Sequence, residues 1–380
     1  MQNIFGTGTM RSGGSLVLSI MEIYKNTKTL CEIFYFSRHI YKKYGNYFSN
    51  EVLYKLSGEL SLRLYFRNGI KISHKQIFNY LKKFRIKNYN NVYDVLSKLI
   101  LNKLISKNQS IKNFVDYSNG EWRFVKDFLN LNKKNKSFIV MRDPRSVFSS
   151  FKKLTFNKNF SYLNCVFNWI DCAQYYFHYK KKYKMDKFLP LIFENIHLEP
   201  KNNVKKICKF LNVGYKKEYL ENKSFKKIKD KNLIMSAYST RNVYGFNIKR
   251  NNNWKAELQK WEIYFIEKVC HKYMKKLNYN FIFSKKETKY EKIIRLKINK
   301  NKIIKQRYAN FLKYKKGTNL RTNDPSNPKN WTSRHSNTKF TKDAEYKIFI
   351  SNQKKVNQNY KVLKKIGLNK FLQKKNVFIN

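Results

Sequence analysis

Residues 6–15 read Gly-Thr-Gly-Thr-Met-Arg-Ser-Gly-Gly-Ser and hold four of the 12 glycines in a chain of 380 residues. Glycine lets the backbone turn tightly and approach a ligand without a Cβ clash. A helix-forming apolar run follows from Leu16 to Met21. The free N–H groups and the dipole at a helix start favour an anion. The stretch therefore predicts an anion-binding loop between a strand over 2–6 and a helix over 13–25.

The spacing within this stretch refines the prediction. Gly8-x-x-x-x-Gly13-Gly14-Ser15 has the spacing of a phosphate-binding loop, but Gly14 stands where Lys is usual. The cation is instead Arg11, inside the loop. Taken alone, these residues also fit a glycine-rich turn that binds nothing.

A second candidate loop follows a wholly apolar run, Phe138 to Met141, which predicts a strand buried on both faces. The run ends in Arg142-Asp143-Pro144-Arg145. Asp143 is a good N-cap and Pro144 suits the first helical position, so we expect a helix to begin there. A guanidinium beside free helical N–H groups can grip a phosphate. In isolation, a surface Arg–Asp pair that caps a helix explains the residues equally well.

Strand and helix patterns alternate along the chain. We expect strands over 2–6, 29–35, 138–141 and 188–194, and helices over 13–25, 121–133, 144 onward, 160–184, 201–212 and 256–276. Residues 36–110 are mostly helical in pattern, and residues 217–250 are loop-like. The alternation predicts an α/β fold with a central parallel sheet covered on both faces.

Together the two loops resemble those of the sulfotransferase family. The family's 5′-phosphosulfate loop reads like Gly-x-x-Arg-Ser-Gly-Thr-Thr/Ser-Leu-Leu, here residues 8–17, and its 3′-phosphate loop reads like Arg-Asp-Pro-Arg with a Ser eight residues after the first Arg. Residues 191–213 are similar to its "YEDL…P…ICxFLGV" segment, and residues 254–279 to its "WK…L…IE…M…LGY" segment. The order and spacing of the four motifs carry the resemblance, which covers about residues 2–283.

The resemblance implies a three-layer fold like that of P-loop NTPases, and a cofactor, 3′-phosphoadenosine 5′-phosphosulfate (PAPS). The implied reaction is in-line transfer of the sulfuryl group to a hydroxyl or amine, with no metal. Arg11 would stabilise the charge on the leaving phosphate. The 5′-phosphosulfate would be held by Gly8, Ser12, Gly13, Gly14 and Ser15. The 3′-phosphate would be held by Arg142 and Ser150, with Arg250 as a weaker candidate.

The chain departs from the family at three points. Gly14 replaces a Thr, which removes one hydroxyl contact to the donor. Asp116-Tyr117-Ser118-Asn119 resembles a "DxSK" segment but has Asn119 where Lys is common. Asn195 stands where Asp usually follows Glu194.

The general base must lie within hydrogen-bond reach of the acceptor. Cytosolic relatives use a His between the two loops, not far ahead of the second one, but the chain has no His between His74 and His178. Tyrosylprotein and bacterial relatives use a Glu on the strand after the first helix, which corresponds to Glu32 here. A carboxylate in an apolar strand is costly to bury without a role. Glu121 is the reserve, and either carboxylate also fits a salt-bridged structural role.

The chain is strongly basic, with 81 Lys and Arg against 24 Asp and Glu and a net charge of +57. Such charge attracts nucleic acid, acidic glycans and anionic lipids in a salt-dependent way. Lys, Asn, Ile, Tyr and Phe are all frequent, and the chain has only five Pro. Because an A/T-rich coding sequence produces this joint bias, we expect no specific nucleic-acid partner.

Five cysteines show no pairing pattern, which is typical of buried thiols in a reducing compartment. No stretch reaches the roughly 18 apolar residues that span a membrane. We therefore expect a cytoplasmic protein, with peripheral, charge-driven contact at an anionic inner membrane surface as a further hypothesis.

The domain organisation expected is a sulfotransferase domain over 1–284, with 36–110 as a helical insertion on the acceptor side, and a basic extension over 285–380. Residues 286–316 are helix-compatible, and Asn323-Asp324-Pro325-Ser326-Asn327-Pro328 indicates a loop. Three interpretations of the extension stay open: a small helical addition, a docking surface for a polyanion, or a partly disordered segment. A solvated basic tail is the simplest interpretation.

Three classes of function fit the sequence. The first is a sulfotransferase whose acceptor is a saccharide of a glycan or glycolipid. The second is a P-loop nucleotide kinase, which would need an acidic side chain to hold magnesium. The third is a polyanion-binding protein on a degenerate sulfotransferase fold, which the substitutions at Gly14 and Asn119 keep open.

Overall fold

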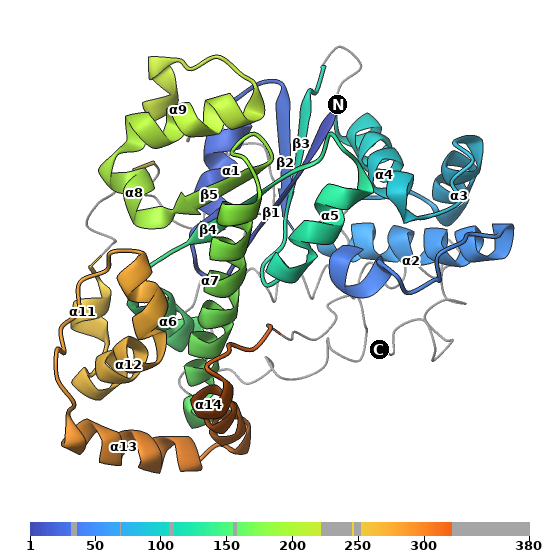
Figure 1. Ribbon diagram of the computed structural model, residues 1–380. Helices are drawn as coiled ribbons and strands as arrows, with labels where there is room; N and C mark the ends of the chain where they lie inside the picture. Colours follow the sequence, from blue (N-terminus) through green and yellow to red (C-terminus); the bar gives the residue numbers. More distant parts are fainter. Residues whose placement is uncertain are drawn as a thin grey trace, which may run out of the picture.

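The computed structural model describes residues 1–31, 36–68, 70–105, 110–154, 158–221, 245–246 and 252–320. Its centre is a five-stranded sheet in the order β2-β3-β1-β4-β5, with every neighbouring pair parallel. The strands are β1 (Gln2–Gly8), β2 (Thr27–Cys31), β3 (Asn113–Tyr117), β4 (Lys136–Met141) and β5 (Phe188–Ile192). The predicted α/β fold with a parallel sheet is therefore confirmed (Figure 1).

Helices cover both faces of the sheet (Figure 1). One apolar core joins the sheet to α1 (Gly14–Glu22), α8 (Phe193–Leu198) and α9 (Pro200–Leu211). The other core joins it to α4 (Tyr89–Leu104), α5 (Val125–Leu131), α6 (Pro144–Leu154), α7 (Asn164–Lys182) and α12 (Lys260–Lys276). Because side chains alternate along a strand, the neighbours Ile4 and Phe5 of β1 are buried in opposite cores.

The segment between β2 and β3 is helical. It contains a π-helical turn (Phe36–Ile40), α2 (Asn50–Asn68), α3 (His74–Lys83) and α4. Its interior includes a fully buried ion pair between Arg63 and Glu59, 2.6 Å apart. Such a pair is tolerated inside a protein because its partners satisfy each other. The assignment of residues 36–110 to the acceptor side stays a prediction.

Strand β3 is the element that the sequence pattern does not predict, because Asn113 and Asp116 interrupt its apolar run. Both side chains are buried with partners. The Asn113 amide donates to the carbonyl of Leu211 at 2.9 Å, and Asp116 accepts from the Tyr93 hydroxyl at 2.9 Å. Polar residues thus sit in a buried strand because distant segments supply their hydrogen bonds.

The C-terminal part of the described chain packs against the core. After α11 (Trp254–Glu257) and α12 come α13 (Thr288–Asn299) and α14 (Lys302–Tyr314). Ile294, Ile298 and Ile304 are buried. These two helices therefore form a small helical addition and not a solvated tail. Residues 321–380 lie outside the described residues.

Beyond α14, residues 317–320 run along α7. The Thr318 N–H donates to the carbonyl of Phe167 at 3.0 Å, and the Asn168 amide donates to the carbonyl of Thr318 at 2.7 Å. The remaining short helical turns are Trp122–Phe124, Lys158–Leu163 and Lys217–Leu220. Among the helices that the structure describes, none is both long and apolar enough to cross a membrane.

Candidate active site

The first loop joins the end of β1 to the start of α1, as predicted. Gly13 caps the helix with φ 98° and no side-chain hydrogen bond, and Arg11 has φ 70°. The Ser12 N–H donates to the carbonyl of Thr9 at 3.1 Å and closes the turn. A left-handed conformation is costly for a residue with a side chain, and such residues concentrate at functional sites.

The glycines allow close packing around this loop. A Cβ atom on Gly8 would lie 2.6 Å from Ser12 Oγ and 2.7 Å from the Val140 carbonyl oxygen. A Cβ on Gly13 would lie 2.0 Å from the ring of Phe193. Backbone approach, rather than flexibility, therefore explains the glycine cluster.

The second loop begins where β4 ends and leads into α6. The Asp143 carboxylate accepts the Arg145 N–H at 2.8 Å, and Pro144 is the first helical residue. The predicted N-cap and helix start are confirmed. This arrangement satisfies an N–H group that a helix start leaves without a partner.

Arg145 ties this loop to the C-terminal motif. Its guanidinium pairs with Asp143 and with Glu267, each at 2.7 Å, and its centre lies 4.1 Å from the ring of Trp254. All three charged side chains are buried. Arg145 is therefore an anchor that positions the loop, because its guanidinium is the shared cation of two buried carboxylates.

Glu194 ties the loop to the third motif. It accepts the Asp143 N–H at 2.9 Å and the Tyr279 hydroxyl at 2.8 Å. Burial raises the pKa of Glu194, and burial together with the Glu194 charge raises the pKa of Tyr279. The segments that carry the resemblance, far apart in sequence, thus converge on this second loop.

Arg142 stands between the two loops. Its Nη1 donates to the carbonyl of Arg11 at 3.1 Å, and its guanidinium lies 4.4 Å from the centre of the Phe193 ring. Burial lowers the pKa of Arg142, Glu194 opposes this shift, and Arg11 adds to it. A guanidinium stays charged at neutral pH in spite of such a shift.

A direct side-chain contact also joins the loops. Arg11 Nε donates to Ser150 Oγ, on α6, at 2.8 Å. Arg11, Arg142 and Ser150 are thus brought together at one edge of the sheet, where β1 and β4 end (Figure 1). Ser12 is buried in the loop, and Ser15 lies in the first turn of α1. Glu32 and Arg250 lie outside the described residues.

Glu121, the reserve base, lies beside the first loop. Its N–H donates to Thr7 Oγ1 at 3.1 Å, next to the end of β1. Its carboxylate forms an ion pair with Arg38 and accepts the Ser37 hydroxyl at 2.7 Å. The carboxylate of Glu121 therefore lies near the site, but its contacts with Arg38 and Ser37 also fit a structural role.

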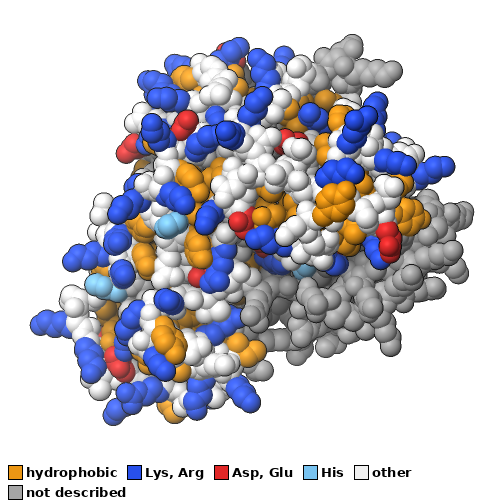
Figure 2. All heavy atoms as spheres, turned by 45° about the vertical axis from the view of Figure 1, so that its right-hand side comes forward, with side chains coloured by type: hydrophobic (Ala, Val, Ile, Leu, Met, Phe, Trp, Pro, Cys, Tyr) orange, Lys and Arg blue, Asp and Glu red, His pale blue; other side chains and the backbone are white. Residues whose placement is uncertain are grey.

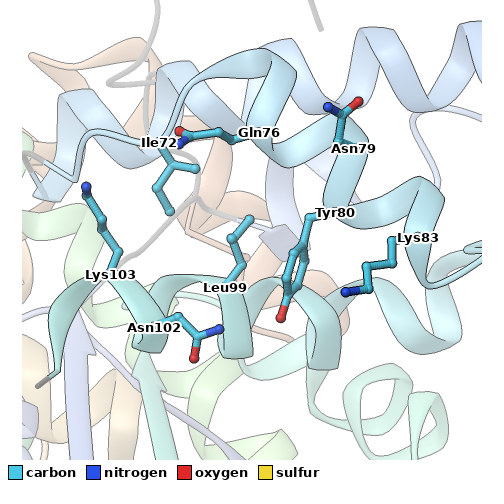
Figure 3. Close-up of a pocket in the computed structure, with 8 residues that line it drawn as sticks. All are labelled: Ile72, Gln76, Asn79, Tyr80, Lys83, Leu99, Asn102 and Lys103. Carbon is cyan, nitrogen blue, oxygen red and sulfur yellow. The ribbon is translucent and has the colours of Figure 1, made fainter. Parts of the chain in front are cut away.

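A pocket of about 420 Å³ lies elsewhere, between α3 and α4 (Figure 3). It is lined by Ile72, Gln76, Asn79, Tyr80, Lys83, Leu99, Asn102 and Lys103. None of the predicted donor-binding residues lines it. The described residues contain no cluster of three or more His, Cys, Asp or Glu side chains that could hold a metal ion.

Positive charge is spread over the surface. Figure 2 shows Lys and Arg side chains across the whole described part of one face, with few acidic ones between them. The basic side chains on that face form no single stripe. Their spread follows from the composition of the chain, which has 81 basic and 24 acidic residues.

The two loops bring together several groups that can donate hydrogen bonds to phosphate oxygens. Gly8, Gly13 and Gly14 let neighbouring atoms pack directly against the backbone of the first loop. The buried Thr9 hydroxyl has no hydrogen-bond partner among the described residues. Arg142 and Ser150 add a charged fork and a hydroxyl. These are the donors that phosphate oxygens accept from.

Comparison with known proteins gives the family. The model of a sulfotransferase family matches residues 3–217. The chain belongs to the sulfotransferase family, whose members transfer sulfuryl groups. The predicted resemblance is confirmed. No curated protein sequence matches the chain.

Several solved structures are similar to the chain. The sulfotransferase domain of the Synechococcus PCC 7002 olefin synthase has 16% identity and a TM-score of 0.41, with 71% of this chain and 94% of that one covered. The sulfotransferase domain from the curacin biosynthetic pathway has 14% identity and a TM-score of 0.47, with 74% and 99% covered. Retinol dehydratase in complex with retinol and PAP has 14% identity and a TM-score of 0.38, with 74% and 83% covered.

Proposed function

We propose that this protein transfers the sulfuryl group of PAPS to a hydroxyl or amine, with a saccharide of a glycan or glycolipid as the acceptor. One observation carries the proposal. The two predicted anion-binding loops meet at the same edge of the sheet, where Arg11 hydrogen-bonds with both Arg142 and Ser150. The donor carries one phosphate on the 3′ oxygen and one on the 5′ oxygen of its ribose, so two anion sites at a common edge match its charge distribution.

Each loop has its own task in this proposal. The first loop holds the 5′-phosphosulfate with the N–H groups at the start of α1, and the buried hydroxyls of Thr9 and Ser12 stand beside them. The second loop holds the 3′-phosphate with the Arg142 guanidinium and the Ser150 hydroxyl. Arg11 and Ser150 exchange their mutual hydrogen bond for contacts to the donor.

Arg11 is the proposed catalytic cation. When bound, the donor supplies a sulfuryl group whose sulfur bonds to the acceptor oxygen as its bond to the 5′-phosphate oxygen breaks. Negative charge then grows on that phosphate oxygen, and a cation held beside it stabilises the transition state more than the ground state. The left-handed backbone at Arg11 supports this role, because strain of this kind is retained where geometry matters.

The proposed general base is Glu32, which directly follows β2 in the sequence. It would take the proton of the acceptor hydroxyl. Glu121 is the alternative base, but the ion pair with Arg38 favours a structural role. Replacing each carboxylate with Gln distinguishes them: the base variant keeps donor binding and loses transfer.

The test is transfer of label from [35S]PAPS to separate panels of oligosaccharides, glycolipids, tyrosine peptides and small alcohols. We expect labelled product from PAPS without added metal, with the saccharide panels giving the highest rate. Transfer from [γ-32P]ATP with magnesium would identify a phosphotransferase instead. Binding of heparin without transfer to any panel would favour a non-catalytic polyanion binder.

A further inference from the structure

We propose that the Tyr117 hydroxyl binds the 5′-phosphate end of the donor, in place of the Thr hydroxyl that is lost at Gly14. This inference rests on the proposed function, and it assigns a ligand contact to a residue on β3, outside both loops.

The register of the sheet fixes the Tyr117 ring. Gly6 of β1 pairs with Tyr117 of β3 on one side and with Phe138 of β4 on the other. Because Gly6 has no side chain, the two rings meet above it, stacked with centroids 6.0 Å apart. A Cβ on Gly6 would lie 2.1 Å from the Phe138 ring. The Tyr117 ring is thereby held over the strand that leads into the first loop.

The ring also occupies the space of the missing side chain. A Cβ atom on Gly14 would lie 2.1 Å from Tyr117 Cζ and 2.4 Å from its hydroxyl oxygen. Real Cβ atoms do not approach other atoms so closely, so a Thr at position 14 would require the Tyr117 ring to move from its place. The Gly14 departure from the family is therefore one half of a coupled exchange, in which the tyrosine replaces the threonine.

The hydroxyl end of the ring points into the loop. Tyr117 OH lies 3.4 Å from Ser12 Oγ and 3.0 Å from the position of a Cβ on Gly8. The hydroxyl thus lies beside Ser12 Oγ and in the space where side chains of Gly8 and Gly14 would begin. These three residues belong to the predicted binding site of the 5′-phosphosulfate. A neutral hydroxyl that donates to a charged phosphate oxygen makes one of the stronger protein hydrogen bonds. The coupled exchange keeps a hydroxyl at the start of α1 although the loop itself has lost one.

The test uses two nucleotides that differ at this end. Adenosine 3′,5′-bisphosphate has the 5′-phosphate and adenosine 3′-monophosphate lacks it. Tyr117→Phe keeps the ring and its stacking on Phe138 but removes the hydroxyl. We expect it to weaken bisphosphate binding by about tenfold in calorimetry and to leave the monophosphate unchanged, since a hydrogen bond to a charged group is worth about that factor.

A matched control is Tyr24→Phe. Tyr24 is buried in the same apolar core, but its hydroxyl contacts Cys208 Sγ at 2.7 Å. This variant loses a buried hydroxyl without touching the loop. Both nucleotides should bind it as they bind the unchanged protein. Equal loss of bisphosphate binding in both variants would show a general packing effect and would overturn the proposal.

A second set of variants tests the exchange itself. Gly14→Thr alone should weaken bisphosphate binding strongly, because the new Cβ meets the Tyr117 ring. Tyr117→Ala alone removes both the ring and the hydroxyl, so it should also weaken bisphosphate binding. The pair Gly14→Thr with Tyr117→Ala restores a loop hydroxyl and relieves the clash, so it should bind the bisphosphate at least tenfold more tightly than Gly14→Thr alone. No rescue would contradict the exchange.

The outcomes separate this inference from the proposed function. If the unchanged protein binds the bisphosphate and Tyr117→Phe binds it equally well, the role of Tyr117 is wrong while the donor site stands. If the unchanged protein binds no bisphosphate, the proposed function fails and the inference fails with it.

Discussion

The two loops of the candidate site are built in different ways. The first loop takes its shape from the backbone, with left-handed conformations at Arg11 and Gly13 and glycines where neighbours approach closely. The second loop is held by buried charges, in which Arg145 joins Asp143 to Glu267. The first loop owes its shape to glycines without side chains, and the second loop owes its shape to ion pairs between side chains.

The difference predicts how each loop responds to mutation. A buried charge network is destabilised strongly when one member is removed, because its partners are left uncompensated. A loop shaped by its backbone tolerates the loss of a side chain that serves the ligand. Removing a member of the buried network of Asp143, Arg145 and Glu267 should therefore change stability first. Removing a side chain that serves the ligand should change binding or activity first.

The largest effect is expected from Arg145→Met. Its removal leaves Asp143 and Glu267 buried without their cation, and breaking such a pair costs about 3–5 kcal/mol. Urea unfolding followed by circular dichroism measures the loss. The matched control is Lys55→Met, which breaks an exposed pair with Glu51 on α2 and should hardly change the stability, because water screens exposed charges. Equal losses in the two variants would show that the buried charges do not hold the second loop.

The next effect is on catalysis. Arg11→Ala should lower the turnover number by roughly 10²–10³-fold, the usual consequence of losing one group that stabilises transition-state charge. Urea unfolding should show little change. Steady-state sulfuryl transfer from PAPS measures the rate, and Arg11→Lys is the control that keeps the charge. Unchanged turnover in Arg11→Ala would rule out its catalytic role.

Arg142→Ala tests ligand binding by a residue of the second loop that lies outside the Arg145 ion pairs. Its guanidinium should bind the 3′-phosphate, so the variant should bind adenosine 3′,5′-bisphosphate roughly 10- to 100-fold more weakly, as for a lost charged hydrogen bond. Binding of adenosine 5′-monophosphate should hardly change, since that ligand has no 3′-phosphate. Equal weakening of both ligands would mean that Arg142 acts on the loop rather than on the phosphate.

The smallest effect is expected from Ser150→Ala. The hydroxyl is a neutral donor whose partner in the structure is Arg11 Nε. Its loss should weaken the bisphosphate by about tenfold or less and leave the urea midpoint unchanged. A larger effect on turnover than on affinity would show that Ser150 acts mainly by positioning Arg11.

The sequence predicts the parts of this site that depend on local patterns. The Asp143 cap, the helix that begins at Pro144 and the turn before Gly14 follow from short-range chemistry, and the structure confirms them. The motifs in the sequence also predicted the sulfotransferase family, which the family match confirms. The roles assigned to Arg11, Arg142 and Ser150 stay predictions, although the structure brings these residues together.

The remainder depends on contacts between distant segments. Asp116 looks unsuited to a buried strand until Tyr93 satisfies it. The proposed role of Tyr117 in donor binding depends on the sheet register, which places its ring beside Gly14, far away in the sequence. The helices α13 and α14 look like a basic tail because three buried isoleucines are few among many lysines.

The most direct test of the account is calorimetric binding of adenosine 3′,5′-bisphosphate, compared with ADP and magnesium. Moderate salt suppresses the general attraction of a chain with net charge +57 for anions. The account predicts tight binding of the bisphosphate and little binding of ADP with magnesium. Preference for ADP with magnesium, or binding of neither nucleotide, would contradict a PAPS site formed by the two loops.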